Sequence, residues 1–337
     1  MSDLSSRYLG LALKNPLVAS ASPLSRQLDS ARHLEDAGIS ALVMYSLWEE
    51  DLLAEERQYE RFMHHQALGH GEASSFLPPQ PEFQSSLDQY LEQLQSLKAH
   101  LDIPVIASLN GVSETGWVGY GRDLQDAGAD ALEINVYYIA ADRDETSLEV
   151  ERRYLDVLAH LEDAVSIPVS IKLSPQFSSP LHFAHHLHQA GANGLVIFNR
   201  FYQSDIDLDS LSVEPHLQLS DPYEALLRIR WAAILRGMLD IDIAVTGGFH
   251  RWEDVIKALL VGANAVQLCS TLLTHGPDAV PGLLASMERW LDEKEYESVQ
   301  QMQGSLSHRN AADPAAFERE SYRAVLDSFS PPPGVRY

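Results

Sequence analysis

Polar side chains able to bind or activate a ligand recur along the chain next to short apolar runs. Lys172 lies inside one such run, Ser170-Ile171-Lys172-Leu173, where a buried ammonium group is costly unless an anion or an electron-rich ligand pairs with it. Asn110, Asn135 and Asn199 end or follow three other runs. Gathered at one place, these groups could hold a planar polar ligand and stabilise a developing negative charge. The alternative is that Lys172 lies at a strand end and reaches solvent.

Two further motifs have the composition of a phosphate-binding site. Gly247-Gly248 follows one apolar run, and Cys269-Ser270-Thr271 follows the next. Glycine lets backbone N–H groups approach phosphate oxygens closely, and the Ser270 hydroxyl could add a hydrogen bond. A lone Gly-Gly is more often a tight turn, so the prediction rests on the two motifs occurring in successive units.

The elements that would position these residues repeat eight times. Each short aliphatic or β-branched run is followed by a stretch with helical period, as expected for parallel strands covered by helices. The runs are Pro16–Ala19, Ser40–Tyr45, Pro104–Leu109, Ala131–Val136, Pro168–Leu173, Gly194–Phe198, Ile241–Val245 and Ala263–Leu268. Four of them are preceded by a glycine that would end a helix in the left-handed conformation, at Gly38, Gly128, Gly191 and Gly262.

Eight such units favour a closed (β/α)₈ (TIM) barrel of class α/β over an open, doubly wound sheet. We expect the barrel to occupy residues 1–310, with a C-terminal extension over 311–337. In such barrels, the residues at the C-terminal ends of the strands form the active-site mouth. The residues expected there are Ser20, Ser46, Asn110, Asn135, Lys172, Asn199, Arg200, Gly247, Gly248, Cys269 and Ser270.

One long segment interrupts this rhythm. Residues 47–81 follow the second strand and end in a proline cluster. A long loop at the mouth is a candidate lid. The alternative is a surface excursion with its own short helix over Glu49–Phe62, and the sequence does not decide between them.

Composition excludes several classes of protein. The 337 residues carry 24 basic and 48 acidic side chains, a formal net charge of −24, which makes nucleic acid and anionic membranes poor partners. Cys269 is the one cysteine, so the chain alone can form no disulfide and ligate no iron–sulfur cluster. No signal pattern or membrane-length apolar run is found, so we expect a cytoplasmic protein. His182 and His186 have metal-compatible spacing but no acidic or cysteine companion, and no metal site is expected.

The motifs together resemble the class 1 dihydroorotate dehydrogenases and their dihydroorotate dehydrogenase-like relatives, from about Tyr8 to Ser307. The resemblance rests on Asn15-Pro16-Leu17-Val18-Ala19-Ser20-Ala21, Glu133-Ile134-Asn135, Lys172, Asn199, Gly247-Gly248 and Ser270. It implies an FMN-dependent enzyme acting on a small molecule, with a homodimeric assembly and a possible electron-transfer partner protein. It places Ser20, Ala21, Ser46, Asn110, Asn135, Lys172, Gly247, Gly248, Cys269 and Ser270 around FMN. The substrate would contact Tyr45, Asn135, Asn199 and Arg200.

Three positions depart from the family pattern. Tyr138 stands where the family has its cysteine or serine base, Ala140 replaces a substrate asparagine, and Tyr45 replaces a lysine. A phenol with a pKa near 10 is a poor base at neutral pH but a competent proton donor. Tyr138 and Lys172 are therefore the predicted catalytic residues, and dihydroorotate is expected to react very slowly or not at all. Alternatively, Tyr138 only forms a wall of the cavity.

The predicted function is an FMN-dependent oxidoreductase acting on a CH–CH or C=C bond of a small planar substrate. Two alternatives stay open: a non-catalytic flavin or electron-relay protein, and a flavin-free, phosphate-binding barrel that acts as an isomerase or synthase.

Overall fold

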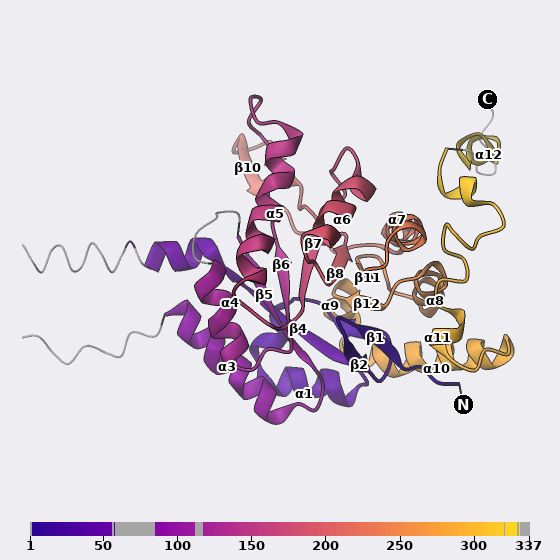
Figure 1. The fold of residues 1–337 in the computed structure, drawn as a ribbon, viewed down its shortest axis with the longest axis horizontal. Helices are drawn as coiled ribbons and strands as arrows, with labels where there is room; N and C mark the ends of the chain where they lie inside the picture. Colours follow the sequence, from indigo (N-terminus) through magenta and orange to yellow (C-terminus); the bar gives the residue numbers. More distant parts are fainter. Residues whose placement is uncertain are drawn as a thin grey trace, which may run out of the picture.

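Eight parallel strands close into a barrel in the computed structural model (Figure 1). The structure describes residues 2–55, 57, 85–111, 117–319, 321–328 and 330. Around the barrel the strands are β3 (Leu17–Ala19), β4 (Ala41–Trp48), β5 (Val105–Asn110), β6 (Ala131–Asn135), β7 (Val169–Leu173), β8 (Gly194–Ile197), β11 (Asp242–Thr246) and β12 (Ala265–Leu268), and β12 pairs with β3 to close it. The predicted (β/α)₈ barrel is confirmed.

One strand end was predicted wrongly. The second strand was expected to end at Tyr45, but β4 continues to Trp48. Its register with β5 shifts between Val43 and Ser46, after which Leu47 pairs with Leu109. The apolar run in the sequence ends before the strand does, because the irregularity adds residues to β4 that do not follow the regular alternation of a strand.

Helices follow the strands and surround them (Figure 1). They are α1 (Leu28–Asp36), α3 (Ser86–His100), α4 (Trp117–Asp126), α5 (Ser147–Glu162), α6 (Pro180–Gln189), α7 (Ala225–Met238), α8 (Trp252–Val261), α9 (Ser270–His275) and α10 (Ala279–Glu293). Capping boxes start α3 at Ser85 and α5 at Thr146. Gly38, Gly128, Gly191 and Gly262 have φ values of 109°, 101°, 104° and 115°, which confirms the predicted left-handed helix ends.

The apolar core has two parts. Side chains between the strands and helices form the larger one, and a smaller one fills the interior of the barrel. The N-terminal hairpin of β1 (Ser6–Tyr8) and β2 (Leu11–Leu13) inserts Tyr8, Leu9 and Leu13 into the smaller core. Its tight turn uses positive φ at Leu9 and Gly10, 53° and 74°. This hairpin packs against the end of the barrel where the strands begin. The opposite end, where the strands finish, is therefore left open for the site.

A second excursion was not predicted. Between β8 and α7 the chain forms an antiparallel hairpin of β9 (Ser204–Asp207) and β10 (Ser212–Pro215), followed by a short 3-10 helix, η2 (Pro222–Glu224). Most of the long segment after β4 lies outside the described residues, apart from a helical stretch at residues 49–55 and 57. The lid interpretation of 47–81 therefore stays a prediction.

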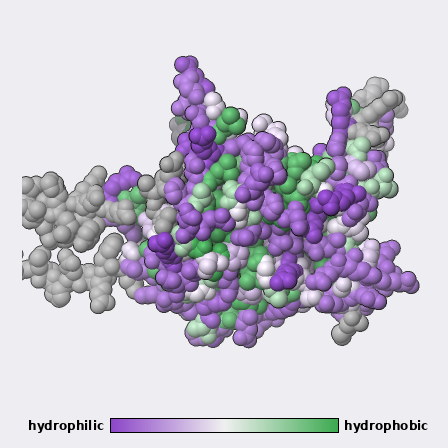
Figure 2. Space-filling view, in the orientation of Figure 1, coloured by the Kyte–Doolittle hydropathy of each residue, from purple (hydrophilic) through white to green (hydrophobic). Residues whose placement is uncertain are grey.

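The C-terminal segment runs back over the outside of the barrel. It contains α11 (Val299–Met302), a 3-10 helix, η3 (Pro314–Phe317), and α12 (Ser321–Asp327), which lies away from the barrel in Figure 1. Figure 2 shows a face dominated by hydrophilic residues with apolar patches between them. Among the described residues, no helix is long and apolar enough to cross a membrane.

Candidate active site

A layer of buried polar side chains lies above the apolar interior of the barrel. Ser108, Glu133, Ser170 and Gln267 come from the strands β5, β6, β7 and β12, and each is at most 1% exposed. Side chains on alternate strand positions point into a barrel, so these residues share its interior with the apolar cluster around Val43 and Val196. Buried polar groups are nearly always hydrogen-bonded, so the side chains of this layer are expected to bind one another.

Lys172 and Glu133 form the centre of this layer. The Lys172 Nζ donates to Glu133 Oε1 at 3.0 Å and lies 3.5 Å from Ser20 Oγ. The amide of Gln267 donates to the other carboxylate oxygen, Glu133 Oε2, at 2.6 Å, and Ser20 Oγ donates to Gln267 Oε1 at 3.2 Å. The lysine is thus held at the C-terminal end of the barrel by an ion pair and not by solvent.

The three asparagines also lie at strand ends. Asn199 Nδ2 donates to Asn135 Oδ1 at 2.6 Å, so residues after β8 and at the end of β6 meet across the mouth. Asn110 is 3% exposed, and its Nδ2 has no hydrogen-bond partner among the described residues. A buried amide without an acceptor costs about 1–3 kcal/mol, so Asn110 has the property expected of a ligand-binding group. Ser46 Oγ lies 2.9 Å from Ser108 Oγ, beneath this mouth.

The predicted phosphate-binding motifs meet at Ser220. The Ser220 hydroxyl donates to Ser270 Oγ at 2.7 Å and accepts from the Gly248 N–H at 3.0 Å. The Ser220 N–H also donates to Ser270 Oγ, at 3.0 Å. Ser270 begins α9, whose first N–H groups have no acceptor within the helix. Three loops therefore converge at the start of a helix, a setting suited to an anion.

Close backbone packing explains the two glycines. Both have positive φ, 91° at Gly247 and 92° at Gly248. A Cβ on Gly248 would overlap the backbone nitrogen of Ala225 and lie 2.9 Å from the carbonyl oxygen of Asp221. Behind Gly247, the buried Arg228 donates from Nε to the Thr246 carbonyl at 3.0 Å. The glycines let the start of α7 pack directly against the loop after β11.

Arg200 and Cys269 lie next to this cradle. Arg200 Nε donates to Glu224 Oε2 at 3.1 Å, and Arg228 lies 3.5 Å from the same oxygen. Burial raises the pKa of the Cys269 thiol, although the cationic Lys172 and Arg200 oppose the shift. The Cys269 Sγ also lies 4.0 Å from the Ala21 carbonyl oxygen, which joins the ends of β12 and β3. These interactions place Ala21, Lys172, Arg200 and Cys269 around one mouth.

Two predicted site residues are directed elsewhere. The Tyr138 hydroxyl donates to Glu145 Oε2 at 2.7 Å, and its ring stacks under Arg153 of α5 at 4.5 Å. The hydrogen bond to Glu145 is the main cause that raises the pKa of Tyr138. The Tyr45 ring packs edge-on against Tyr90 of α3, with centroids 5.0 Å apart, and lies under Arg26. Their catalytic and substrate-binding roles stay predictions.

Sequence reasoning missed three members of the site. Gln267 could have been found, because a lone amide inside the apolar run Ala265–Leu268 needs a buried partner. Ser220 gives no local signal, because it lies in an irregular loop whose path depends on the β9–β10 hairpin. Arg228 looks like an ordinary residue of an amphipathic helix, and its burial depends on how α7 docks.

These residues fit a flavin mononucleotide. The isoalloxazine edge that gains negative charge on reduction would meet Lys172, and the free Nδ2 of Asn110 would donate to a ring acceptor. The phosphate would be held at Ser270 and the glycine loop. The geometry thus defines a (β/α)₈-barrel enzyme whose mouth joins an anion cradle to a buried cation.

Comparison with known proteins gives the family. A family model described as dihydroorotate dehydrogenase matches residues 83–291, and the chain belongs to this family. The chain is 24% identical, over 90% of its length and 99% of the relative, to the catalytic subunit of dihydroorotate dehydrogenase B (NAD(+)) from Thermoplasma acidophilum. It is 30% identical, over 58% of its length and 65% of the relative, to dihydroorotate dehydrogenase A (fumarate) from Limosilactobacillus reuteri.

A third relative has a different name. The chain is 23% identical, over 91% of its length and 77% of the relative, to the PreA subunit of the NAD-dependent dihydropyrimidine dehydrogenase of Escherichia coli. The predicted family is therefore confirmed, and with it an oxidoreductase acting on CH–CH donors. The family is one of flavoproteins that act on small molecules.

Proposed function

We propose that the chain is an FMN-dependent oxidoreductase that interconverts a CH–CH and a C=C bond of a small planar substrate other than dihydroorotate. The single observation that carries the proposal is the buried Lys172–Glu133 pair, 3.0 Å between Nζ and Oε1, at the mouth of the barrel. A buried ion pair gives little net stability, so its presence at the C-terminal end of the barrel favours a functional role.

Each group has a distinct task in this proposal. Bound FMN supplies hydride transfer. Lys172 holds positive charge beside the flavin edge, and Ser20, Ala21, Ser46, Asn110 and Asn135 contact the ring. Gly247, Gly248, Cys269 and Ser270 surround the phosphate. Asn135 and Asn199, already joined by a 2.6 Å hydrogen bond, would turn their remaining polar atoms to the substrate, with Arg200 at the rim.

Tyr138 is the proposed proton donor. Its raised pKa, caused first by the hydrogen bond to Glu145, keeps the phenol protonated and unsuited to act as a base. Donation to a substrate carbon would require the hydroxyl to leave Glu145 when the substrate binds. The loop that carries Tyr138 joins β6 to α5, at the same end of the barrel as Lys172.

The same departures argue against dihydroorotate. Each missing hydrogen bond to a polar substrate group is worth about 1–3 kcal/mol, so the two substitutions at Tyr45 and Ala140 predict a roughly 30- to 10⁴-fold loss. Loss of the base should lower the rate of dihydroorotate oxidation by another factor of roughly 10²–10⁴. The test is to purify the protein, identify the released cofactor and follow flavin turnover with pyrimidines and enones in both directions.

The outcomes of this test are separable. A yellow protein with one FMN per chain that reacts with an enone or a pyrimidine other than dihydroorotate supports the proposal. Stopped-flow reduction by dihydroorotate within about tenfold of a family member would contradict the substrate argument. A colourless protein that takes up no FMN would contradict the assignment of FMN as the cofactor. Family membership favours this oxidoreductase over the electron-relay and isomerase alternatives.

The assembly belongs to the proposal as well. We expect a homodimer, and an electron-transfer partner protein is compatible with relatives whose names include NAD(+) and a catalytic subunit. The cytoplasmic location stays a prediction. The β9–β10 hairpin supports the dimer, because its side chains Ile206 and Val213 form a cross-strand pair on an exposed surface.

A further inference from the structure

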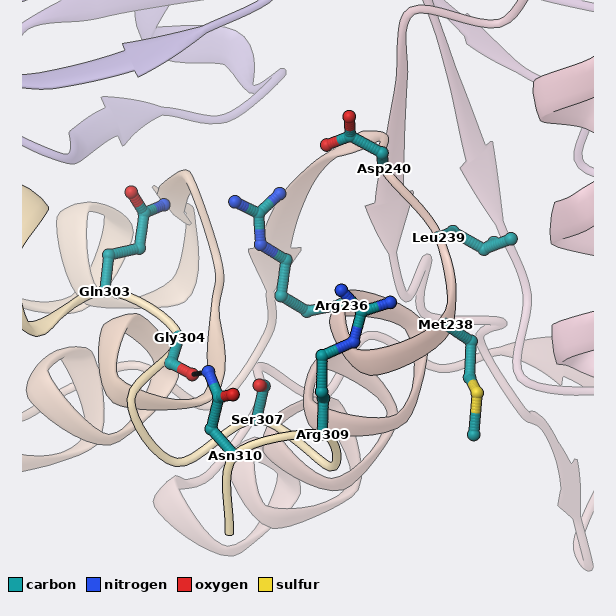
Figure 3. Close-up of a pocket in the computed structure, with 9 residues that line it drawn as sticks. All are labelled: Arg236, Met238, Leu239, Asp240, Gln303, Gly304, Ser307, Arg309 and Asn310. Atoms are coloured by element: carbon teal, nitrogen blue, oxygen red, sulfur yellow. Dashed lines mark hydrogen bonds between the residues drawn. The ribbon is translucent and has the colours of Figure 1, made fainter.

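A hollow on the outside of the barrel, remote from the mouth, is lined by two arginines (Figure 3). It lies where the segment 303–310 crosses the C-terminal end of α7 and the turn into β11. Its volume is about 460 Å³, within the range of small-molecule sites. Its lining residues are Arg236, Met238, Leu239, Asp240, Gln303, Gly304, Ser307, Arg309 and Asn310.

The walls of this hollow are fixed by backbone hydrogen bonds. The N–H of Gly304 donates to the Leu259 carbonyl at 3.0 Å and that of Leu306 to the Leu260 carbonyl at 2.8 Å. The N–H of His308 donates to the Ala233 carbonyl at 3.0 Å. The crossing segment is therefore attached to the C-terminal half of α7 and to the end of α8, and the hollow exists before any ligand arrives.

The Arg236 side chain is held in place by its neighbours. A Cβ on Gly262 would overlap the Arg236 Cγ, so the residue there must be a glycine, and its φ of 115° has the same consequence. On the other side, a Cβ on Gly304 would lie 3.9 Å from Arg236 Nε. Figure 3 shows the Arg236 side chain, from α7, and the Arg309 side chain, from the crossing segment, lining the hollow with their guanidinium groups apart from each other.

The lining of this hollow carries more positive than negative charge. Neither guanidinium forms a hydrogen bond or an ion pair with another residue in the part of the chain that the structure describes. Asp242 is near enough for Arg236 to influence its pKa, which burial raises, but its oxygens accept from the Leu9 N–H at 2.7 Å and the Asn264 amide at 3.0 Å. Two arginines against one carboxylate, Asp240, in the lining of a hollow in a chain of net charge −24 favour an anionic ligand.

We propose that this hollow binds a small phosphate monoester, with the phosphate between Arg236 and Arg309. Guanidinium forks match the oxygens of a phosphate dianion, and two forks match its charge. The rest of the hollow suits a hydroxylated group. The amide nitrogens of Gln303 and Asn310 already donate to the carbonyls of Ala263 at 2.7 Å and Gly304 at 2.9 Å. Their amide oxygens, with the Asp240 carboxylate, are left to accept from ligand hydroxyls.

The test uses FMN-saturated protein, so that the cradle at Ser270 does not compete for phosphate. Calorimetric titrations at low ionic strength would compare inorganic phosphate, ribose 5-phosphate and adenosine 5′-monophosphate. We expect one saturable site per chain, with at least one ester binding tighter than inorganic phosphate. Arg236→Gln and Arg309→Gln should each weaken binding about tenfold or more, because each removes a charge-assisted pair. Arg230→Gln, at an exposed position on the same helix, should leave it unchanged.

Several results would overturn the proposal. The site does not exist if none of the three probes binds saturably, or if both pocket variants bind like the unmodified protein. Equal affinity for inorganic phosphate and both esters contradicts the monoester assignment. Succinate, titrated in addition as a dianion without phosphorus, contradicts the choice of phosphate if it binds more tightly than the esters. Arg309 is exposed, so Arg309→Gln keeps the test decisive even if Arg236→Gln perturbs folding.

Discussion

The residue with the greatest influence on the chemistry is Lys172, and its effect depends on Glu133. The carboxylate is 1% exposed and is bound by both Lys172 and Gln267. The sequence predicted a lysine facing a flavin, but it did not predict that an acid would share its charge. The reason is that Glu133 and Lys172 are 39 positions apart and meet only because β6 and β7 are neighbours in the barrel.

Glu133→Gln should therefore raise the FMN reduction potential. Removing the carboxylate leaves the lysine charge fully available to stabilise the reduced flavin. The shift should be tens of millivolts, since about 1.4 kcal/mol corresponds to roughly 30 mV in a two-electron couple. Spectroelectrochemical titration measures it, and Glu253→Gln, at a half-buried position in the first turn of α8, serves as the control. An unchanged or lower potential in the folded, FMN-loaded variant would contradict this role.

Lys172→Met should lower the potential and weaken FMN binding. The structure adds that it should also destabilise the fold by about 3–5 kcal/mol, because it leaves the Glu133 carboxylate buried without its cation. The double variant with Glu133→Gln should recover most of this stability but only part of the potential, because it removes the carboxylate without restoring the cation. Chemical denaturation and redox titration separate the two effects. Equal stability of the single and double variants would argue against a buried ion pair.

Tyr138→Phe tests the proposed proton donor. If the hydroxyl protonates the substrate, turnover should fall about 10²- to 10⁴-fold while FMN binding stays unchanged. Because the pKa of Tyr138 is raised above its ordinary value near 10, the loss of activity through phenol ionisation should have its midpoint above pH 10. Steady-state kinetics over pH, with Tyr223→Phe at an exposed position as control, provides the measurement. Turnover within twofold would leave Tyr138 as a wall of the cavity.

At the scale of elements, strands buried on both faces were predicted and exposed ones were not. The eight barrel strands read as apolar runs, and four glycines marked the turns into them. The strands β9 and β10 are exposed along nearly their whole length, so they carry no apolar alternation to detect. The same difference applies to the residues of the site. Residues on barrel strands were placed from the sequence, whereas Ser220 depends on the hairpin loop.

The close contact at Gly248 gives a prediction at this scale. Gly248→Ala should weaken FMN binding and lower the melting temperature, because its Cβ would overlap the Ala225 backbone and displace α7 from the cradle. Gly282→Ala is the matched control, since a Cβ there meets nothing within 4 Å. In a helix such a change is neutral or stabilising by up to about 1 kcal/mol. Thermal melts with and without FMN provide the comparison. Equal behaviour of both variants would contradict the packing argument.

For the whole molecule, the surface that most needs a partner is the β9–β10 hairpin. Its strands form a two-stranded sheet in the part of the chain that the structure describes, and sheet edges with unpaired backbone groups favour association. Ile206 and Val213 face each other across it and are 61% and 71% exposed. A second copy could cover the same patch on both subunits at once, the self-complementary arrangement of a two-fold dimer.

We therefore expect light scattering to give about twice the chain mass of 37.5 kDa at micromolar concentration. Val213→Glu should shift the protein towards monomers, because a charge at the centre of an apolar contact of roughly 800 Å² per subunit would be buried without a counter-ion. Val325→Glu, on the exposed surface of α12, should keep the dimer. Both variants should retain FMN, since neither side chain lies in the barrel mouth. A monomeric unmodified protein would refute the dimer, and a dimeric Val213→Glu would place the interface on another surface.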